Sequence, residues 1–331
     1  MRFCVVGAGA MGCLYGGSLA RAGYDVTLVD PWAEHVAAIN GAGLRLGGLG
    51  GDGRIAVHAT IAPAGVAPAD AVIVLADANS TAAAGRAATG LVKPHGFVLT
   101  LQNGIGNWET LAPIVGEART LAGLSYHSAA MAGPGHALHT NAGPTWIGER
   151  DGSASGRITR LEQAFAAAGL NPVIVDDIVG YIWDKWVLNC AANAVCAITG
   201  LRNGEARRTP PVAEYQERII DEALAVRAAK GVKGHDPDLK ATILGFLKKK
   251  YNKPSMLLHI EAGKRTEIDA LNARLVEEGR RLGVPTPYND ALACLLKGVE
   301  HKRREATGRT EADYAALEAQ AEREPRPAPR S

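Results

Sequence analysis

The chain has 331 residues, of which 47% are hydrophobic and 5% aromatic, and its formal net charge is +2. This length predicts about two domains, and a charge near zero without a concentrated basic stretch argues against nucleic acid as a partner. No apolar run reaches the roughly 18 residues that cross a membrane. Gly7, Gly9 and Gly12 interrupt the apolar start that would otherwise suggest an export signal.

The cysteines predict a reducing environment. Their number is odd, and their spacing matches no zinc-binding pattern. We interpret all of them as small buried hydrophobic residues, and we expect a cytoplasmic protein without a metal site. The five are Cys4, Cys13, Cys190, Cys196 and Cys294.

The first 175 residues alternate short apolar runs with Ala-rich helical stretches. The clearest strands are predicted at residues 2–7, 25–30, 71–76 and 97–102, with helices at 11–22 and 80–91. Nearly continuous apolar strands are typical of a parallel sheet that is buried on both faces. Later runs at 121–129, 137–140, 145–148 and 172–175 are predicted to extend this sheet.

From residue 176 the pattern becomes helical. Long helices are predicted at 177–197, 211–230, 255–282 and 287–303, and Gly283 with Pro285 ends the third. We therefore expect a dinucleotide-binding α/β domain at 1–175, a helical domain at 176–310 and a C-terminal tail at 311–331. The end of the tail is rich in proline and charge and is predicted to be disordered.

A glycine motif follows the first predicted strand. The residues at this turn are Gly7, Ala8, Gly9, Ala10, Met11 and Gly12. Glycines at these positions of a strand–turn–helix unit let the backbone approach a pyrophosphate, which sits at the positive end of the helix. The alternative is a tight turn without a ligand, but the position at the start of a βαβ unit favours the dinucleotide site.

Asp30 ends the second predicted strand, at about the expected distance from this motif. An acidic residue there accepts a hydrogen bond from the ribose 2′-hydroxyl of NAD. Pro31 follows as a suitable first helical residue, so Asp30 is also a candidate helix cap. The two roles are compatible.

Further segments resemble the ketopantoate reductase family. They are residues 100–107 (TLQNGIGN), 183–190 (WDKWVLNC), 252–256 (NKPSM), 266–269 (TEID) and 279–287 (GRRLGVPTP). The resemblance covers almost the whole chain, to about residue 300. It implies a Rossmann-type domain followed by an all-α domain that resembles the C-terminal domain of 6-phosphogluconate dehydrogenase.

The resemblance also implies the site residues. Lys185 is the expected general acid, and Glu267 is expected to bond near the reacting oxygen and to help orient Lys185. A positioned cation can supply a proton and stabilise a developing alkoxide, and burial would lower its pKa toward neutrality. Asn103 is expected between the nicotinamide and the substrate. The remaining substrate-binding candidates are Asn189, Asn193, Asn252 and Ser255.

The residue types themselves leave other readings open. By spacing alone Lys185 could be a solvated surface lysine, and Glu267 could be a helix charge paired with Lys264. Asn189 and Asn193 follow Lys185 on one helical face, where either a substrate or a buried structural network would satisfy them.

Two more candidates have ordinary alternatives. Ser255 could be the N-cap of a long helix, and Asn252 could be a turn residue.

The sequence departs from the family at the cofactor. Many relatives carry an arginine where Asp30 and Pro31 stand, and a lysine where Asp77 stands; both cations help to hold the 2′-phosphate of NADP. A carboxylate about 4 Å from a phosphate costs roughly 4 kcal/mol at an effective dielectric of 20. The sequence therefore predicts NAD as the preferred cofactor, with Asp30 and Asp77 both at its site.

Other departures lie nearer the substrate: Ala194 follows Asn193 where a proline is usual, His259 stands at a usually acidic position, and Ala273 replaces a glycine. We predict hydride transfer between a nicotinamide and a small 2-oxo or 2-hydroxy acid, as in 2-dehydropantoate 2-reductase. The alternatives are an NAD-dependent D-2-hydroxyacid dehydrogenase and a non-catalytic NAD-binding regulator, and a homodimer is a further hypothesis. The regulator is disfavoured because it would not need Lys185.

Overall fold

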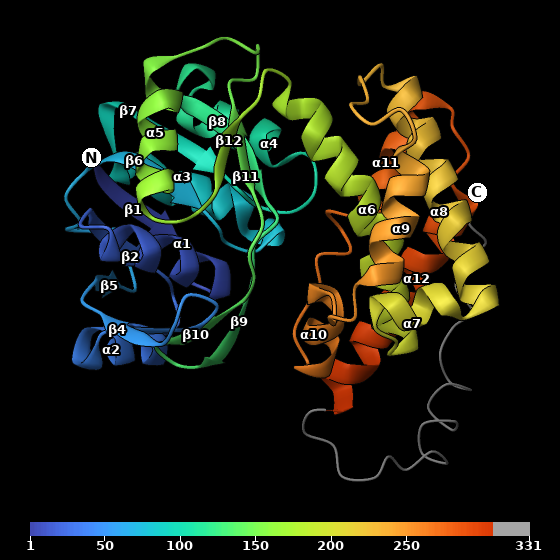
Figure 1. Ribbon diagram of the computed structural model, residues 1–331, viewed down its shortest axis with the longest axis horizontal. Coiled ribbons are helices and arrows are strands. Elements are labelled where there is room, and N and C mark those ends of the chain that lie inside the picture. The colour runs from blue at the N-terminus through green and yellow to red at the C-terminus, as the bar shows by residue number, and fades with distance from the viewer. Residues whose placement is uncertain (307–331) are drawn as a thin grey trace, which may run out of the picture.

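The computed structural model describes residues 1–306, so the predicted tail at 311–331 lies outside them. An α/β lobe contains all strands of the described chain and ends at Ile174. A helical lobe begins at Ile178 and lies beside it (Figure 1). The long helix that starts at Ile178 runs down the junction between the two lobes.

The main sheet has the strand order β12-β11-β8-β7-β6-β1-β2-β5. Its strands are β1 (Arg2–Val6), β2 (Asp25–Val29), β5 (His58–Thr60), β6 (Ala69–Val74), β7 (Val92–Thr100), β8 (Thr120–Ser125), β11 (Thr145–Gly148) and β12 (Pro172–Ile174). From β5 to β8 all neighbours are parallel, whereas β11 is antiparallel to β8. β1 lies between β2 and β6, where the strand order reverses, and ligands of open α/β sheets bind at such a switch point.

Helices cover both faces of this sheet, as the continuous apolar strands predicted. Phe3 and Val5 of β1 pack with one set of helices, and Cys4 and Val6 pack on the opposite face. The helices of this lobe are α1 (Ala10–Arg21), α2 (Ala33–Ala42), α3 (Thr81–Leu91), α4 (Asn107–Val115) and α5 (Gly156–Ala167), with 3-10 turns η1 (Ala78–Ser80) and η2 (Glu117–Arg119). The predicted Rossmann-type fold is thus confirmed.

A second, four-stranded sheet corrects part of the prediction. It has the order β4-β3-β10-β9 and consists of β3 (Leu44–Gly48), β4 (Gly53–Ile55), β9 (Ser128–Gly133) and β10 (His136–Asn141). The run at 121–129 is not one strand, because the chain turns at Tyr126 and His127 and passes from β8 to β9. The run at 137–140 belongs to β10, a strand of this second sheet, and does not extend the main sheet.

The helical lobe contains α6 (Ile178–Thr199), α7 (Asn203–Arg208), α8 (Pro210–Ala229), α9 (Leu239–Lys249), α10 (Ser255–Glu261), α11 (Asn272–Leu282) and α12 (Pro287–Ala306). α6 begins where the carboxylate of Asp177 accepts a hydrogen bond from the Gly180 amide, and it ends at Gly200 with φ +73°. The short helices α7 and α9 were not among the predicted elements.

The predicted helix at 255–282 is wrong in its middle. α10 ends at Glu261, and Gly263 adopts φ +65°, a backbone conformation that favours glycine. Residues 262–271 then connect α10 to α11, which ends at Gly283 (φ +69°) as predicted. The interruption removes Glu267 from a helix and places it at the lobe junction.

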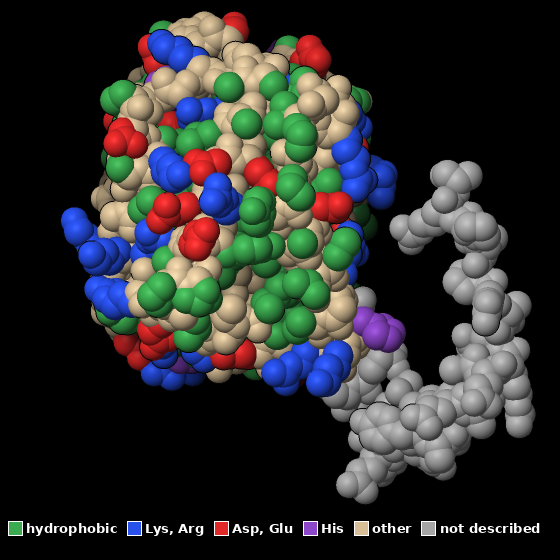
Figure 2. Space-filling model, turned by 90° about the vertical axis from the view of Figure 1, so that its right-hand side faces the viewer, with side chains coloured by type: hydrophobic (Ala, Val, Ile, Leu, Met, Phe, Trp, Pro, Cys, Tyr) green, Lys and Arg blue, Asp and Glu red, His purple; other side chains and the backbone are tan. Residues whose placement is uncertain are grey.

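The cysteine prediction holds for four positions and fails at one. Cys294 is exposed on α12, whereas the other four are buried. Figure 2 shows positive, negative and apolar side chains intermixed on the outer face of the helical lobe. No helix within residues 1–306 is long and apolar enough to cross a membrane.

Candidate active site

In the turn between β1 and α1, backbone segments approach each other so closely that two of the glycines leave no room for a side chain. A side chain at Gly7 (φ +92°) would meet the backbone nitrogen of Ala76 at 2.3 Å, and one at Gly12 would meet the carbonyl oxygen of Gly7 at 2.0 Å. Gly9 is different, because a side chain there would face open space. Gly9 is also the N-cap of α1, and it has no side chain to cap the helix. An open, uncapped helix N-terminus at the switch point fits a pyrophosphate.

Asp30 lies at the same edge of the sheet. Its backbone amide donates to the carbonyl oxygen of Thr60, the last residue of the neighbouring strand β5. Its carboxylate accepts a hydrogen bond from the Trp32 amide at 3.0 Å. The N-cap of α2 is Trp32, so Asp30 stabilises the turn before the helix. A carboxylate therefore stands at the end of β2, beside the glycine turn.

Asp77 follows β6 and starts the turn η1. Its carboxylate accepts hydrogen bonds from the backbone amide of Asn79 at 2.8 Å and from the Asn79 side chain at 2.6 Å. The next amide, that of Ala78, donates to the carboxylate of Glu267 at 3.1 Å. The loop after β6 thus joins the two lobes.

Lys185 occupies the centre of this junction. Its ammonium donates to the side-chain oxygen of Asn103 at 3.1 Å and to the carbonyl oxygen of Ser125 at 2.6 Å. The Asn103 side-chain nitrogen donates to Glu267 at 3.3 Å. The Asn103 amide therefore lies between the cation and the carboxylate and links them by hydrogen bonds.

Burial shifts both charged groups. It lowers the pKa of Lys185 to about 8, and the negative charge of Glu267 partly opposes this shift. Burial also raises the pKa of Glu267, and the nearby carboxylate of Asp77 adds to the increase. A lysine with a pKa near neutrality can release and recover a proton at physiological pH.

The segment after β7 holds Asn103 in place. The side chain of Asn107, at the start of α4, donates to the Asn103 carbonyl at 2.9 Å. Gln102 donates to the Ala76 carbonyl at 2.9 Å, which ties this segment to the end of β6. Gly104 allows the lobes to approach, because a side chain there would meet the carbonyl oxygen of Ala270 at 2.8 Å.

A second polar cluster lies further along α6. The side chain of Asn193 donates to the backbone and side-chain oxygens of Asn189 at 3.2 and 3.3 Å. Ser255 donates to the Asn193 side-chain oxygen at 3.3 Å. Asn252 lies apart from this cluster and accepts a hydrogen bond from Asn203 at 3.4 Å. These contacts are confined to the helical lobe.

The geometry decides several of the alternatives. Lys185 is not a solvated surface lysine, and Glu267 is not a helix charge paired with Lys264, because it bonds to Ala78 and Asn103. Ser255 is not the N-cap of its helix, since Pro254 holds that position and no side chain caps it.

Sequence reasoning missed two groups beside the lysine. The Ser125 carbonyl binds its ammonium, and the ring of Tyr126 lies 5.6 Å from it. Ser125 is the last residue of β8, a parallel strand, and Tyr126 follows it directly. The available signal was their position at the carboxyl edge of the sheet, where ligands of this fold bind.

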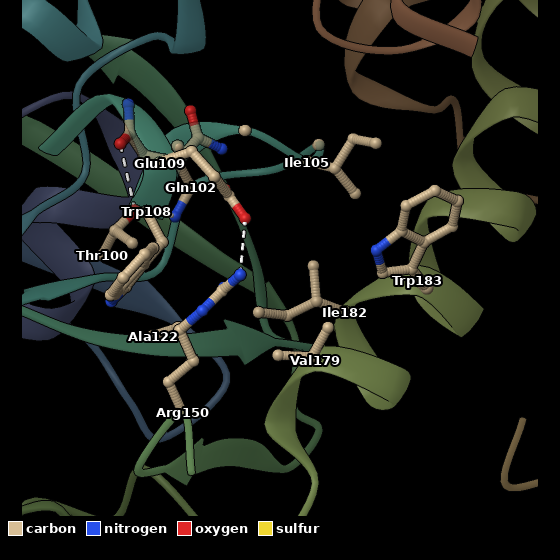
Figure 3. A pocket seen from close by; sticks show the side chains of 14 residues that line it. Thr100, Gln102, Ile105, Trp108, Glu109, Ala122, Arg150, Val179, Ile182 and Trp183 are labelled. Atoms are coloured by element: carbon tan, nitrogen blue, oxygen red, sulfur yellow. Dashed lines mark hydrogen bonds and ion pairs between the residues drawn. The ribbon is translucent and has the colours of Figure 1, made fainter. Parts of the chain in front are cut away.

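A small cavity of about 40 Å³ is lined by residues of β7, of the segment that follows it, of α4 and of the start of α6, among them Gln102, Trp108 and Ile182 (Figure 3). Glu109 and Arg150 form an ion pair of 3.1 Å beside it, and the Arg150 guanidinium lies 4.0 Å from the Trp108 ring centre. Such a volume holds a few water molecules, and a dinucleotide or an organic acid needs far more. This cavity is therefore too small for either ligand.

The glycine turn at the switch point and a half-buried lysine with a lowered pKa define a class: this is an oxidoreductase that binds a dinucleotide cofactor. Comparison with known sequences identifies the family. The family model for ketopantoate reductase PanE/ApbA matches residues 3–152, and the model for its C-terminal domain matches residues 177–300. The chain belongs to the ketopantoate reductase family.

Individual relatives agree with this assignment. The chain is 33% identical over 299 residues to the 2-dehydropantoate 2-reductase of Archaeoglobus fulgidus, covering 90% of this chain and 98% of the relative. It is 32% identical over 300 residues to the enzyme of the same name from Pyrococcus horikoshii, with coverages of 91% and 98%.

Two solved structures are informative. A PanE/ApbA family ketopantoate reductase from Ralstonia eutropha is 36% identical, with a TM-score of 0.86 and coverages of 92% and 100%. A D-mandelate dehydrogenase, solved as a ternary complex with NADH and anilino(oxo)acetate, is 26% identical, with a TM-score of 0.87 and coverages of 92% and 99%. Proteins of this fold thus include both a ketopantoate reductase and a D-mandelate dehydrogenase.

Proposed function

We propose that this nicotinamide-dependent oxidoreductase of 2-oxo and 2-hydroxy acids uses NAD(H) in preference to NADP(H), with Lys185 as its general acid. The observation that carries the catalytic part is the position of Lys185, which lies half-buried at the lobe junction with a pKa of about 8 and, within residues 1–306, donates hydrogen bonds to neutral oxygens. The carboxylates of Asp30, after β2, and Asp77, after β6, are the basis of the proposed cofactor preference.

Lys185, Asn103 and Glu267, the first polar cluster, have different roles in this proposal. A bound nicotinamide supplies or accepts the hydride at the 2-carbon. Lys185 gives a proton to the oxygen in reduction and takes it back in oxidation. Asn103 holds the ammonium through its side-chain oxygen, and Glu267 fixes the opposite end of the same amide.

The second cluster recognises the rest of the substrate. In this proposal Asn189, Asn193 and Ser255 exchange their hydrogen bonds with each other for bonds to the substrate's polar ends, and Asn252 contributes from the rim. These bonds are long, between 3.2 and 3.4 Å, and join neutral groups, so a carboxylate would replace them at a gain.

The cofactor preference follows from charge. Gly7, Gly9, Ala10, Met11 and Gly12 would hold the pyrophosphate of either cofactor. Asp30 would accept a hydrogen bond from a ribose hydroxyl but repel a 2′-phosphate, and Asp77 would add to the repulsion. A few kcal/mol of repulsion corresponds to about 10²–10³-fold discrimination in kcat/KM.

The test compares both cofactors with the native enzyme and with the Asp30→Ala, Asp77→Lys double variant. We expect NADH to be preferred by the native enzyme and the preference to fall or reverse in the variant. Asp25→Ala, which removes an exposed carboxylate at the opposite end of β2, is the matched control. A native preference for NADPH would contradict the assignment of both carboxylates and would favour an ordinary biosynthetic ketopantoate reductase.

A second function, oxidation by an NAD-dependent D-2-hydroxyacid dehydrogenase, uses the same residues. Asp30 and the similarity to D-mandelate dehydrogenase favour it. Turnover of 2-hydroxy acids with NAD, measured beside 2-oxo acids with NADH, separates the two directions. Failure of every 2-oxo and 2-hydroxy acid would instead favour the NAD-binding regulator.

We also propose the organisation in which this activity is carried out: a dinucleotide domain at residues 1–175 and a substrate domain from residue 176, in a cytoplasmic protein. A homodimer is part of this proposal, and sedimentation at enzyme concentrations used for assays tests it.

A further inference from the structure

Lys250 brings a second ammonium group to the lobe junction. It follows α9, and its side-chain nitrogen lies 3.4 Å from the side-chain oxygen of Asn141, which ends β10 in the other lobe. The Asn141 side-chain nitrogen donates to the Tyr126 carbonyl at 2.9 Å. The preceding carbonyl, that of Ser125, binds Lys185. The two lysines therefore reach consecutive residues of one turn, Lys185 directly and Lys250 through Asn141.

Among residues 1–306, the charge of Lys250 lacks the carboxylate partner that several other lysines of the helical lobe have. Other lysines of the helical lobe form ion pairs of 2.6–2.9 Å: Lys230 with Glu278, Lys240 with Asp221, Lys253 with Glu261 and Lys297 with Asp269. Within residues 1–306, no carboxylate forms a salt bridge with Lys250. In this part of the chain its side-chain hydrogen bond goes to the neutral amide oxygen of Asn141, at the long distance of 3.4 Å.

The ammonium of Lys250 lies 5.4 Å from the Phe246 ring, and two arginines bind the backbone on either side of this lysine: Arg208 donates to the Lys248 carbonyl and Arg202 to the Tyr251 carbonyl. The Lys250 carbonyl accepts a hydrogen bond from the Gly204 amide at 2.7 Å, which fixes the backbone of this segment. Asn203 and Asn252, which bond to each other, flank that contact. A half-buried cation beside other cations gains more from an incoming anion than a solvated one does, because screening is weaker there.

We propose that Lys250 determines substrate specificity by binding a second carboxylate at the end of the substrate remote from the reacting carbonyl. This inference rests on the proposed 2-oxo acid activity and names its substrate class, the 2-oxo dicarboxylic acids. The remote position follows from the contacts. A keto carbon and its own carboxylate are one bond apart, whereas the backbone between Ser125 and Tyr126 and the Asn141 side chain separate the two ammonium groups.

A purely structural role for Lys250 makes a different prediction. If its bond to Asn141 only holds the lobes together, its loss would affect all substrates alike. The two roles therefore differ in the ratio of activities toward two substrates, and this ratio does not depend on how much enzyme is folded.

The experiment uses 2-oxoglutarate and 2-oxopentanoate, which have the same number of carbons and differ in the distal carboxylate. We expect the native enzyme to favour 2-oxoglutarate in kcat/KM, and Lys250→Gln to lose at least about tenfold of that ratio, mostly through KM. Lys249→Gln, at the exposed neighbouring lysine, is the control and should keep the native ratio. An unchanged ratio in Lys250→Gln overturns the proposal, as does a native preference for 2-oxopentanoate.

Binding separates this inference from the activity on which it rests. Both acids are titrated calorimetrically into the complex with NAD⁺, where the oxidised cofactor cannot reduce them. Weaker binding of 2-oxoglutarate by Lys250→Gln supports the carboxylate site even if neither acid is turned over with NADH, in which case only the activity fails. Equal affinity of native enzyme and variant for 2-oxoglutarate overturns the site.

Discussion

The two polar clusters along α6 differ in how they are assembled. The cluster of Lys185, Asn103 and Glu267 draws one side chain from the α/β lobe and two from distant parts of the helical lobe. The cluster of Asn189, Asn193 and Ser255 lies within the helical lobe. The first contains two ionisable groups with shifted pKa values, and the second contains none.

This difference indicates a division of labour. The proton transfer proposed for Lys185 depends on the lobes being in contact, because burial at their junction lowers its pKa. Recognition by neutral amides and a hydroxyl does not depend on that burial. We therefore expect changes in the first cluster to act on kcat and on pH dependence, and changes in the second to act on KM.

The largest effect is expected for Lys185→Ala. Removing the general acid should lower kcat by at least about 10²-fold, while NAD binding, which depends on the glycine turn, stays nearly native. Steady-state kinetics and cofactor titration measure both. The control is Lys240→Ala, since Lys240 lies on α9 and forms an ion pair with Asp221 of α8. Near-native turnover of Lys185→Ala would remove the proposed mechanism.

Glu267→Gln tests the link through Asn103. Reduction requires protonated Lys185, so native kcat/KM should fall as the pH rises through about 8, and oxidation should rise over the same range. Because the charge of Glu267 raises the pKa of Lys185, the variant should show this midpoint at lower pH, and each unit of displacement is about tenfold in rate on the falling limb. pH–rate profiles check this. A native midpoint in the variant would show that the two charges are not coupled, and Glu261→Gln on α10 is the control.

The smallest effect is expected for Asn193→Ala. Losing one hydrogen bond to the substrate costs about 1 kcal/mol, which raises KM about fivefold, and kcat should change little. The pH midpoint should stay near 8, since no ionisable group is touched. A variant that lowers kcat or moves the midpoint would break the distinction between the clusters.

The sequence predicted the first turn well because its geometry is local. Gly7 and Gly12 are required by contacts within one strand–turn–helix unit and the strand beside it, so the pattern of the letters alone was informative. The buried strands β1, β2, β6 and β7 were predicted for the same reason. The fold class and the family were then confirmed by the comparisons.

The segment that carries Glu267 could not be predicted in this way. Residues 255–282 have helical composition throughout, and Gly263 alone did not signal a break. The break is stabilised by distant partners: the Thr266 amide donates to Glu300 on α12 at 2.5 Å, and Glu267 bonds to the loop after β6. Long-range contacts also separate β9 and β10 from the main sheet.

The single carboxamide between Lys185 and Glu267 has a consequence for the catalytic cycle. A carboxamide neither gains nor loses a proton in the pH range of enzyme activity, so Asn103 orients its neighbours without relaying protons between them. In the proposed mechanism each reduction leaves Lys185 neutral, and Asn103 gives Glu267 no path along which to return a proton. The proposed mechanism therefore requires water to reach the junction and supply that proton in every cycle.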